Sequence, residues 1–141
     1  MDEMDTIRVL LALPAPILMA EYRTALMRTG YRVGMAADGV QCFRRIRSFR
    51  PDLIVLDVDL LWGGADGVLD VLKEETVDPP VAVLVIGSRS SRAALYRVAR
   101  FAVTDYQSKP VTGQYLVRRI RELLEGEYSP AAGIRIGKSD E

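Results

Sequence analysis

Three short runs of the sequence are almost entirely apolar, and they constrain the fold more than any other feature. They are Ile7–Leu13, Asp52–Val58 and Val81–Ile86, and none contains more than two charged residues. A strand with one face in water alternates apolar and polar residues, whereas a continuous apolar run is typical of a strand buried on both faces. Because sheets covered on both faces are mostly parallel, these runs predict a central parallel sheet.

Segments with helical periodicity separate the apolar runs. Pro16 suits the first turn of a helix and Asp38 suits an N-cap, and the second helix is expected to turn Val40, Phe43 and Ile46 toward the core. Weaker strands are expected at Tyr31–Ala37 and Val103–Gln107, and further helices follow Gly67, Ser90 and Pro110. Five strands alternating with five helices predict an α/β fold, a doubly wound parallel sheet with helices on both faces.

One domain is expected over residues 7–125. Residues 126–141 are rich in Gly, Ser, Pro and Ala and have no periodicity, so they are expected to form a loosely ordered C-terminal tail. A glycine-rich loop is expected at Gly63–Gly67, between the third strand and its helix.

Composition excludes several classes of function. The 141 residues contain no histidine, which excludes Ser-His-Asp and Cys-His catalysis and metal sites built on imidazole. Nineteen basic residues balance nineteen acidic ones, which argues against a nucleic-acid binder held mainly by phosphate contacts. The one cysteine, Cys42, cannot form an internal disulfide and fits a reducing cytosol, so a cytoplasmic protein with no membrane segment is expected.

Candidate functional residues stand where the predicted strands end. In an open parallel sheet, ligands bind outside the carboxyl ends of the strands. Asp57 and Asp59 follow the third strand, Gly87 and Ser88 follow the fourth, and Lys109 follows the fifth. An aspartate and a lysine at neighbouring strand ends predict a carboxylate–ammonium pair, and the lysine could neutralise a phosphoryl group on the aspartate.

These residues resemble the receiver domain of bacterial response regulators, of the chemotaxis-regulator type. The resemblance rests on Asp57 at the end of DLIVLD, Asp66-Gly67, Asp105-Tyr106 and Lys109-Pro110, and it covers residues 7 to about 125. It implies a flavodoxin-like sheet of order 2-1-3-4-5 in a non-enzymatic protein of two-component phosphorelay signal transduction. A cis bond is usual in the family before the proline at position 110.

The resemblance also assigns roles and partners. Asp57 would be the phosphoacceptor, Lys109 would contact the phosphoryl group, and Tyr106 would be an aromatic switch. A sensor histidine kinase or phosphotransfer protein would supply the phosphoryl group. A downstream protein, or a second copy of the chain in a homodimer, would dock on the face made by the fourth helix, fifth strand and fifth helix. No nucleic-acid or membrane partner is expected.

The sequence departs from the receiver pattern at the metal site. Receivers place two acidic residues after the first strand, and these hold Mg²⁺ together with the phosphoacceptor. Here Leu13 and Pro14 stand at those positions and offer no side-chain oxygen. Asp57 and Asp59 are the remaining metal candidates, so the sequence predicts a weak or absent Mg²⁺ site, since this ion requires oxygen ligands.

A second departure concerns the switch. Counting back from Lys109, the usual Ser or Thr position falls on Gly87, and Ser88 would contact the phosphate only if the loop shifted by one residue. The loop after Asp57 also differs, because Leu61 replaces the usual proline and the stretch from Trp62 is about two residues longer.

Three hypotheses follow. The first is a stand-alone, atypical receiver protein with Asp57 as phosphoacceptor. The second is a pseudo-receiver of the same fold, which acts by protein contact alone and in which Asp57 and Lys109 pair only for structure. The third is a haloacid-dehalogenase-like phosphatase, since Asp57-Val58-Asp59 follows an apolar strand as that family's nucleophile motif does. A preceding strand–helix–strand–helix unit and the lack of an acidic motif after Lys109 oppose the phosphatase.

Overall fold

The computed structural model describes residues 6–60, 64–74, 81–87, 105–125 and 136–137 of the 141 residues. Residues 1–5, 61–63, 75–80, 88–104, 126–135 and 138–141 lie outside the described part. Among the described helices, none combines the length and apolar character that crossing a membrane would require.

The strands form one parallel sheet in the order β2-β1-β3-β4-β5-β6. The strand bounds are Arg8–Ala12 for β1, Arg32–Ala36 for β2, Leu53–Asp57 for β3, Ala82–Gly87 for β4, Asp105–Ser108 for β5 and Ile136–Gly137 for β6. The predicted order 2-1-3-4-5 and the parallel pairing are confirmed. β6 adds a sixth strand at the β5 edge, where Tyr106 pairs with Ile136 and Gln107 pairs with Gly137.

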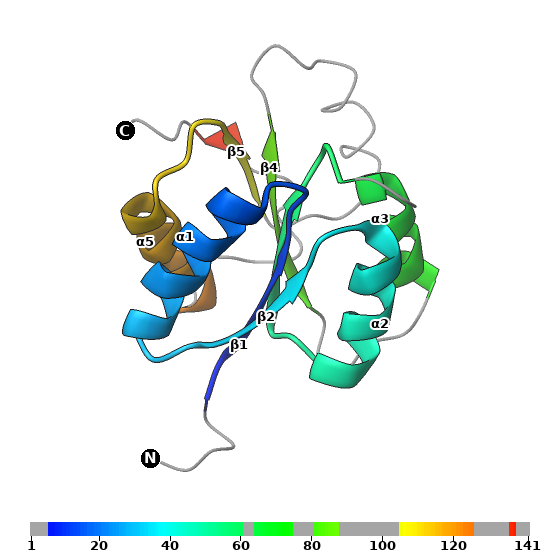
Figure 1. Cartoon of the computed structure of the whole chain (residues 1–141), viewed down its shortest axis with the longest axis horizontal. Coiled ribbons are helices and arrows are strands. Elements are labelled where there is room, and N and C mark those ends of the chain that lie inside the picture. Colours follow the sequence, from blue (N-terminus) through cyan, green and yellow to red (C-terminus); the bar gives the residue numbers. More distant parts are fainter. Residues whose placement is uncertain (1–5, 61–63, 75–80, 88–104, 126–135, 138–141) are drawn as a thin grey trace.

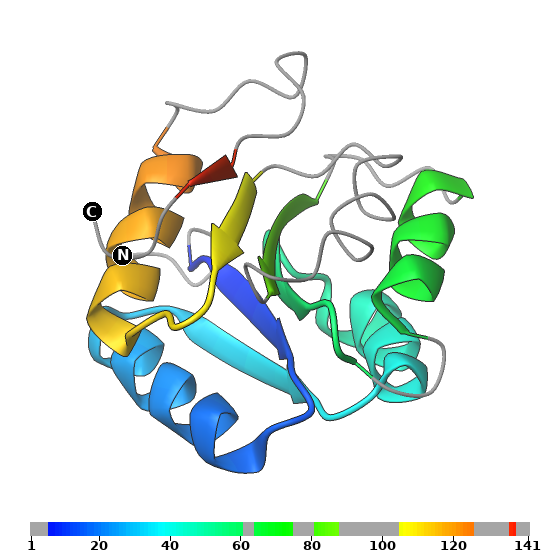
Figure 2. The ribbon, with the colours of Figure 1, turned by 90° about the horizontal axis from the view of Figure 1, so that it is seen from above.

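Four helices lie within the described residues. They are α1 (Pro16–Arg28), α2 (Gly39–Phe49), α3 (Gly64–Glu74) and α5 (Gly113–Leu124). Helices α1 and α5 pack side by side on one face of the sheet, and α2 and α3 pack together on the other (Figures 1 and 2). The helix expected after Ser90 lies outside the described residues.

Local signals in the sequence account for several helix ends. Pro16 occupies the first turn of α1, and Gly30 follows the helix with a φ of 94°, in the left-handed region that favours glycine. The side chain of Asp38 caps α2 by accepting a hydrogen bond from the Gln41 backbone N–H at 2.8 Å, as predicted. Thr112 caps α5 in the same way through the backbone N–H of Tyr115.

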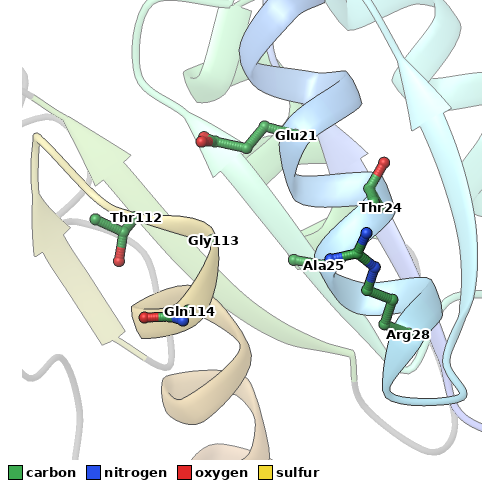
Figure 3. Close-up of a pocket in the computed structure, with 7 residues that line it drawn as sticks. All are labelled: Glu21, Thr24, Ala25, Arg28, Thr112, Gly113 and Gln114. Carbon is green, nitrogen blue, oxygen red and sulfur yellow. The ribbon is translucent and has the colours of Figure 1, made fainter.

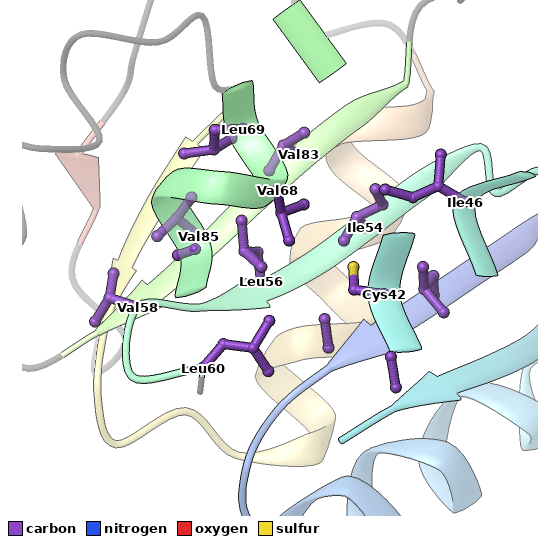
Figure 4. Close-up of a cluster of buried hydrophobic side chains, with 14 of the residues drawn as sticks. Cys42, Ile46, Ile54, Leu56, Val58, Leu60, Val68, Leu69, Val83 and Val85 are labelled. Atoms are coloured by element: carbon purple, nitrogen blue, oxygen red, sulfur yellow. The ribbon is translucent and has the colours of Figure 1, made fainter. Parts of the chain in front are cut away.

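Each face of the sheet carries its own apolar core, because successive strand residues point to opposite sides. Ile54 and Leu56 of β3 belong to the cluster under α2 and α3 (Figure 4), and Leu53 and Val55 belong to the cluster under α1 and α5. A sheet buried on both faces is what the unbroken apolar runs predicted.

Two sequence predictions about the α2–α3 layer are wrong. Val40 was expected to face the core, but its side chain is 45% exposed and Cys42 is fully buried instead. The helical stripe is therefore displaced around α2, since Gly39, Cys42 and Ile46 are its buried positions. The glycine-rich segment was expected to form a loop as far as Gly67, but α3 already begins at Gly64.

Candidate functional site

The carboxyl ends of β3, β4 and β5 bring the predicted site residues together. Asp57 is the last residue of β3 and Gly87 is the last residue of β4, and Lys109 directly follows β5. The register pairs Asp57 with Ile86 and Gly87 with Ser108, so these strand ends lie at one edge of the sheet. The backbone N–H of Lys109 also donates to the Gly87 carbonyl at 2.8 Å, and the Lys109–Pro110 bond is cis, as the resemblance implied.

Asp57 and Lys109 form the ion pair that the strand ends predicted. The Lys109 Nζ atom lies 2.7 Å from Asp57 Oδ2. Asp57 is only 1% exposed, whereas the Lys109 side chain is 32% exposed and reaches the carboxylate from the solvent side. A carboxylate taken out of water requires such a partner, because an unpaired buried charge is strongly unfavourable.

Asp59 contributes mainly through its backbone. Its N–H donates to Asp57 Oδ1 at 2.9 Å, so both carboxylate oxygens of Asp57 have a partner. The Asp59 side chain is 69% exposed and lies 3.7 Å from Lys109 Nζ. Lys109 therefore stands between two carboxylates and supplies positive charge to both.

The residues at the metal position do not fit a tightly held Mg²⁺ ion. Leu13 is fully buried in the apolar cluster under α1 and α5, and Pro14 follows it. Within the described residues there is no group of three or more acidic, cysteine or histidine side chains that could surround a metal. Mg²⁺ requires about six oxygen ligands in a near-octahedral arrangement, and this edge offers the carboxylates of Asp57 and Asp59, which are already shared with Lys109.

Tyr106 points inward, against the end of β4. It is 3% exposed and belongs to the cluster under α2 and α3, together with Val58 and Val85. A Cβ atom placed on Gly87 would lie 2.5 Å from the Tyr106 hydroxyl oxygen and 2.8 Å from a methyl carbon of Val58. Burial raises the pKa of Tyr106, and the negative charges of Asp57 and Asp59 raise it further. The phenol is thus close enough to Asp57, the candidate phosphoacceptor, to feel its negative charge.

Some predicted site features lie outside the described residues. These include Ser88, the expected second phosphate contact, as well as Leu61 and Trp62 in the loop after Asp57. The side chain of Asp66, which is part of the motif on which the resemblance rests, is also not described.

A polar network between β5 and α5 was not expected from the sequence. Arg119 Nε donates to Asp105 Oδ2 at 2.6 Å, and the Gln107 side-chain amide donates to the same oxygen at 2.9 Å. The Tyr115 hydroxyl donates to Gln107, and Arg119 also contacts Glu122. Asp105 is fully buried, and among the described residues its Oδ1 atom has no hydrogen-bond partner. Two features of the sequence could have indicated this network: the charged Asp105 at the start of a buried strand, and Arg119 in the last helix.

A groove of about 440 Å³ lies elsewhere, between α1 and the start of α5 (Figure 3). It carries charges of both signs and does not include Asp57 or Lys109; its lining residues are Glu21, Thr24, Ala25, Arg28, Thr112, Gly113 and Gln114. The carboxyl edge of the sheet is therefore the better candidate for chemistry.

Comparison with known proteins agrees with this geometry. A family model of the response regulator receiver domain matches residues 9–121. The chain belongs to the response regulator receiver family. Receiver domains act in two-component signalling, in which they interact with histidine kinases or phosphotransfer proteins, and they are generally signalling modules that are not enzymes.

Several regulators are similar in sequence. The DNA-binding response regulator MtrA of Mycolicibacterium smegmatis is 30% identical over 137 residues, which covers 95% of this chain and 59% of that protein. The transcriptional regulatory protein AfsQ1 of Streptomyces coelicolor is 35% identical over 100 residues, which covers 71% of this chain and 43% of that protein. The chain thus spans about half the length of the curated relatives it matches.

Solved structures show the same fold. A putative response regulator from Chloroflexus aurantiacus aligns with a TM-score of 0.77 at 21% identity, covering 86% of this chain and 99% of that one. The signal receiver domain of a histidine kinase from Syntrophus aciditrophicus aligns with a TM-score of 0.78 at 22% identity, covering 86% and 92%.

Proposed function

We propose that this receiver domain accepts a phosphoryl group on Asp57 and that Lys109, rather than a tightly held metal ion, supplies most of the positive charge at the site. The observation that carries the proposal is the 2.7 Å contact between Lys109 Nζ and Asp57 Oδ2 at the carboxyl edge of the sheet. The contact places a cation directly beside the only carboxylate that is fully buried at this edge within the described residues.

The transfer can be written with these residues alone. A carboxylate oxygen of Asp57 attacks the phosphorus of a phosphodonor, the bond from phosphorus to the leaving group breaks, and the leaving group departs with its electron pair. The product is an acyl phosphate on Asp57. Negative charge then lies on the phosphoryl oxygens, to which the Lys109 ammonium can turn because its side chain is partly exposed. Attack of water on phosphorus restores the carboxylate and releases inorganic phosphate.

The partners follow from the family. A sensor histidine kinase or a phosphotransfer protein is the proposed donor in the cell. The described part of the proposed output surface is β5 and α5, where a downstream protein or a second copy of the chain would dock.

A pseudo-receiver is the second candidate function, and a specific observation favours it. Both oxygens of Asp57 are already bonded, one to Lys109 and one to the Asp59 backbone N–H, and Leu13 takes the place of a metal ligand. In that case the ion pair would only stabilise the fold, and the protein would signal by contact in its unmodified form.

Phosphorylation by a small-molecule donor separates the two functions. The protein is treated with phosphoramidate, with Mg²⁺ or with a chelator, and the covalent adduct is detected by intact-protein mass spectrometry. We expect the wild type to gain one phosphoryl group under both conditions, Asp57→Asn to gain none, and the matched control Asp70→Asn, at an exposed position of α3, to behave as the wild type.

The contrary outcomes are also distinct. A folded wild type that gains no phosphoryl group under either condition would establish the pseudo-receiver. Labelling that requires Mg²⁺ would retain Asp57 as the phosphoacceptor but refute the metal-independent site.

A further inference from the structure

The end of β4 lacks a side chain at the position from which a serine or threonine hydroxyl would contact a phosphoryl group on Asp57. Position 87 is glycine, and the side chain of Tyr106, from the adjacent strand β5, occupies the space that a side chain at position 87 would fill. A Cβ atom on Gly87 would lie 2.5 Å from the Tyr106 hydroxyl oxygen, so the phenol stands where the hydroxyl-bearing side chain of a serine or threonine would enter. Real Cβ atoms do not approach another atom this closely. A larger residue at position 87 and the inward position of Tyr106 therefore exclude one another.

The phenol is well held in this position. Tyr106 is 3% exposed, its ring packs in the cluster that contains Val58 and Val85, and Val85 is its register partner on β4. Val58 directly follows Asp57, and its N–H donates to the Ile86 carbonyl at 3.0 Å, which fixes the chain after the acceptor against the end of β4. The phenol oxygen thus lies beside Gly87, at the end of β4, and near Val58, which directly follows Asp57.

We infer that Tyr106 supplies, from β5, the hydroxyl that β4 lacks, and that it donates a hydrogen bond to a phosphoryl oxygen carried by Asp57. This inference rests on the proposed function, and it assigns to Tyr106 direct contact with the modified site rather than rotation between an inward and an outward position. Lys109 and Tyr106 then act on the phosphoryl group as a cation and a neutral donor. A neutral phenol suits this task, and burial, together with the negative charges of Asp57 and Asp59, opposes its ionisation.

The test removes the Tyr106 hydroxyl from β5 and introduces a serine hydroxyl at position 87 on β4. The rate of Asp57 phosphorylation by phosphoramidate is measured for the wild type, Tyr106→Phe, and the double variant Tyr106→Phe with Gly87→Ser. Removal of the phenol oxygen also removes the atom nearest to a new Cβ at position 87, so the double variant retains only the contact with Val58. Tyr115→Phe is the matched control, since its hydroxyl bonds to Gln107 on the other face of the sheet.

We expect Tyr106→Phe to slow phosphorylation about 10-fold or more, as the loss of one hydrogen bond to a charged group implies. The double variant should regain most of this rate, and Tyr115→Phe should not change it. A second measurement uses the wild type alone: with ¹³Cζ-labelled tyrosine, the Tyr106 signal should shift when Asp57 is phosphorylated, and it should not shift in Asp57→Asn.

Other outcomes would overturn the inference. If Tyr106→Phe is phosphorylated at the wild-type rate, the phenol only fills space. The same holds if the slower rate of Tyr106→Phe is not restored in the double variant and the ¹³Cζ signal does not move. In both cases the proposed function stands. If the wild type itself is not phosphorylated on Asp57, the proposed function fails, and the inference fails with it.

Discussion

At the scale of single residues, the site depends on one buried carboxylate and the ammonium that reaches it. Asp57 is enclosed at the end of β3, and Lys109 approaches it from solvent to 2.7 Å. The pair follows from the parallel sheet itself, because the carboxyl ends of adjacent strands meet at one edge. Its energetic importance can be measured without any assumption about phosphorylation.

Replacement of Lys109 by methionine should lower the free energy of unfolding. The change keeps the length of the side chain but leaves Asp57 buried without a cation. Removal of one partner from a buried pair costs about 3–5 kcal/mol, and we expect about 2 kcal/mol here because Lys109 is partly exposed. Urea denaturation of Lys109→Met, Asp57→Asn and the double variant measures this cost. In the double variant the loss should be smaller than the sum of the single losses, and strict additivity would contradict the pairing.

Gly87 and Tyr106 should be coupled in stability. Gly87→Ala places a methyl group 2.5 Å from the phenol oxygen, so we expect the overpacked variant to be about 1–3 kcal/mol less stable than the wild type. In a Tyr106→Phe background the same change should cost less, because only the contact with Val58 remains. Chemical denaturation of the four proteins gives the coupling free energy. An equal cost in both backgrounds would mean that the two side chains do not compete for this space.

At the scale of elements, helix ends were easier to predict from the sequence than helix faces. Pro16 and Asp38 determine where α1 and α2 begin through local chemistry that a short window of sequence contains. The burial of Cys42 in place of Val40 depends on how α2 is rotated against the sheet, which no local signal records. The early start of α3 at Gly64 is the exception among the helix ends, because packing against α2 can outweigh the weak helix propensity of glycine.

The network that joins α5 to β5 escaped prediction for a related reason. Asp105 and Arg119 are fourteen residues apart, and their pairing requires both the twist of the sheet and the rotation of the helix. Burial works to lower the pKa of Arg119, but the hydrogen bond to Asp105 and the negative charges of Asp105 and Glu122 outweigh it, so the pKa of the guanidinium is raised. The contact holds α5 against the strand that carries Tyr106.

Loss of the Arg119 side chain should therefore destabilise the α5–β5 unit. Arg119→Met leaves Asp105 fully buried without a cation, and we expect the free energy of unfolding to fall by about 3 kcal/mol. The matched control is Glu122→Gln, which removes a partly exposed partner of the same arginine and should change stability by less than about 0.5 kcal/mol. Thermal and urea unfolding provide the comparison. Similar effects of the two substitutions would show that the buried contact does not anchor the helix.

At the scale of the whole molecule, the sheet was predictable because its signal is distributed over the chain. Unbroken apolar runs, short connections and turn residues all indicated one parallel sheet, and the order of the five strands agrees with that prediction. The addition of β6 was not predictable, since Ile136–Gly137 lies in a segment without periodicity and, within the described residues, pairs with the edge strand β5. The roles of the site residues also stay predictions, because proximity alone does not show which of them receives a phosphoryl group.

The two-sided core should make the whole fold sensitive to alkaline pH. Burial raises the pKa of Cys42 from 9.0 to about 12, and it also raises the pKa of Tyr22 on the opposite face of the sheet. Between pH 9.0 and about pH 12 the Cys42 thiol is ionised in the unfolded chain but still protonated in the folded protein. The free energy of unfolding therefore falls as pH rises through this range. Urea denaturation from about pH 7 to about pH 11 should show a constant stability up to about pH 9 and a decline above it. In Cys42→Ala the baseline should be lower but the decline shallower, and an unchanged slope would show that the thiol does not contribute.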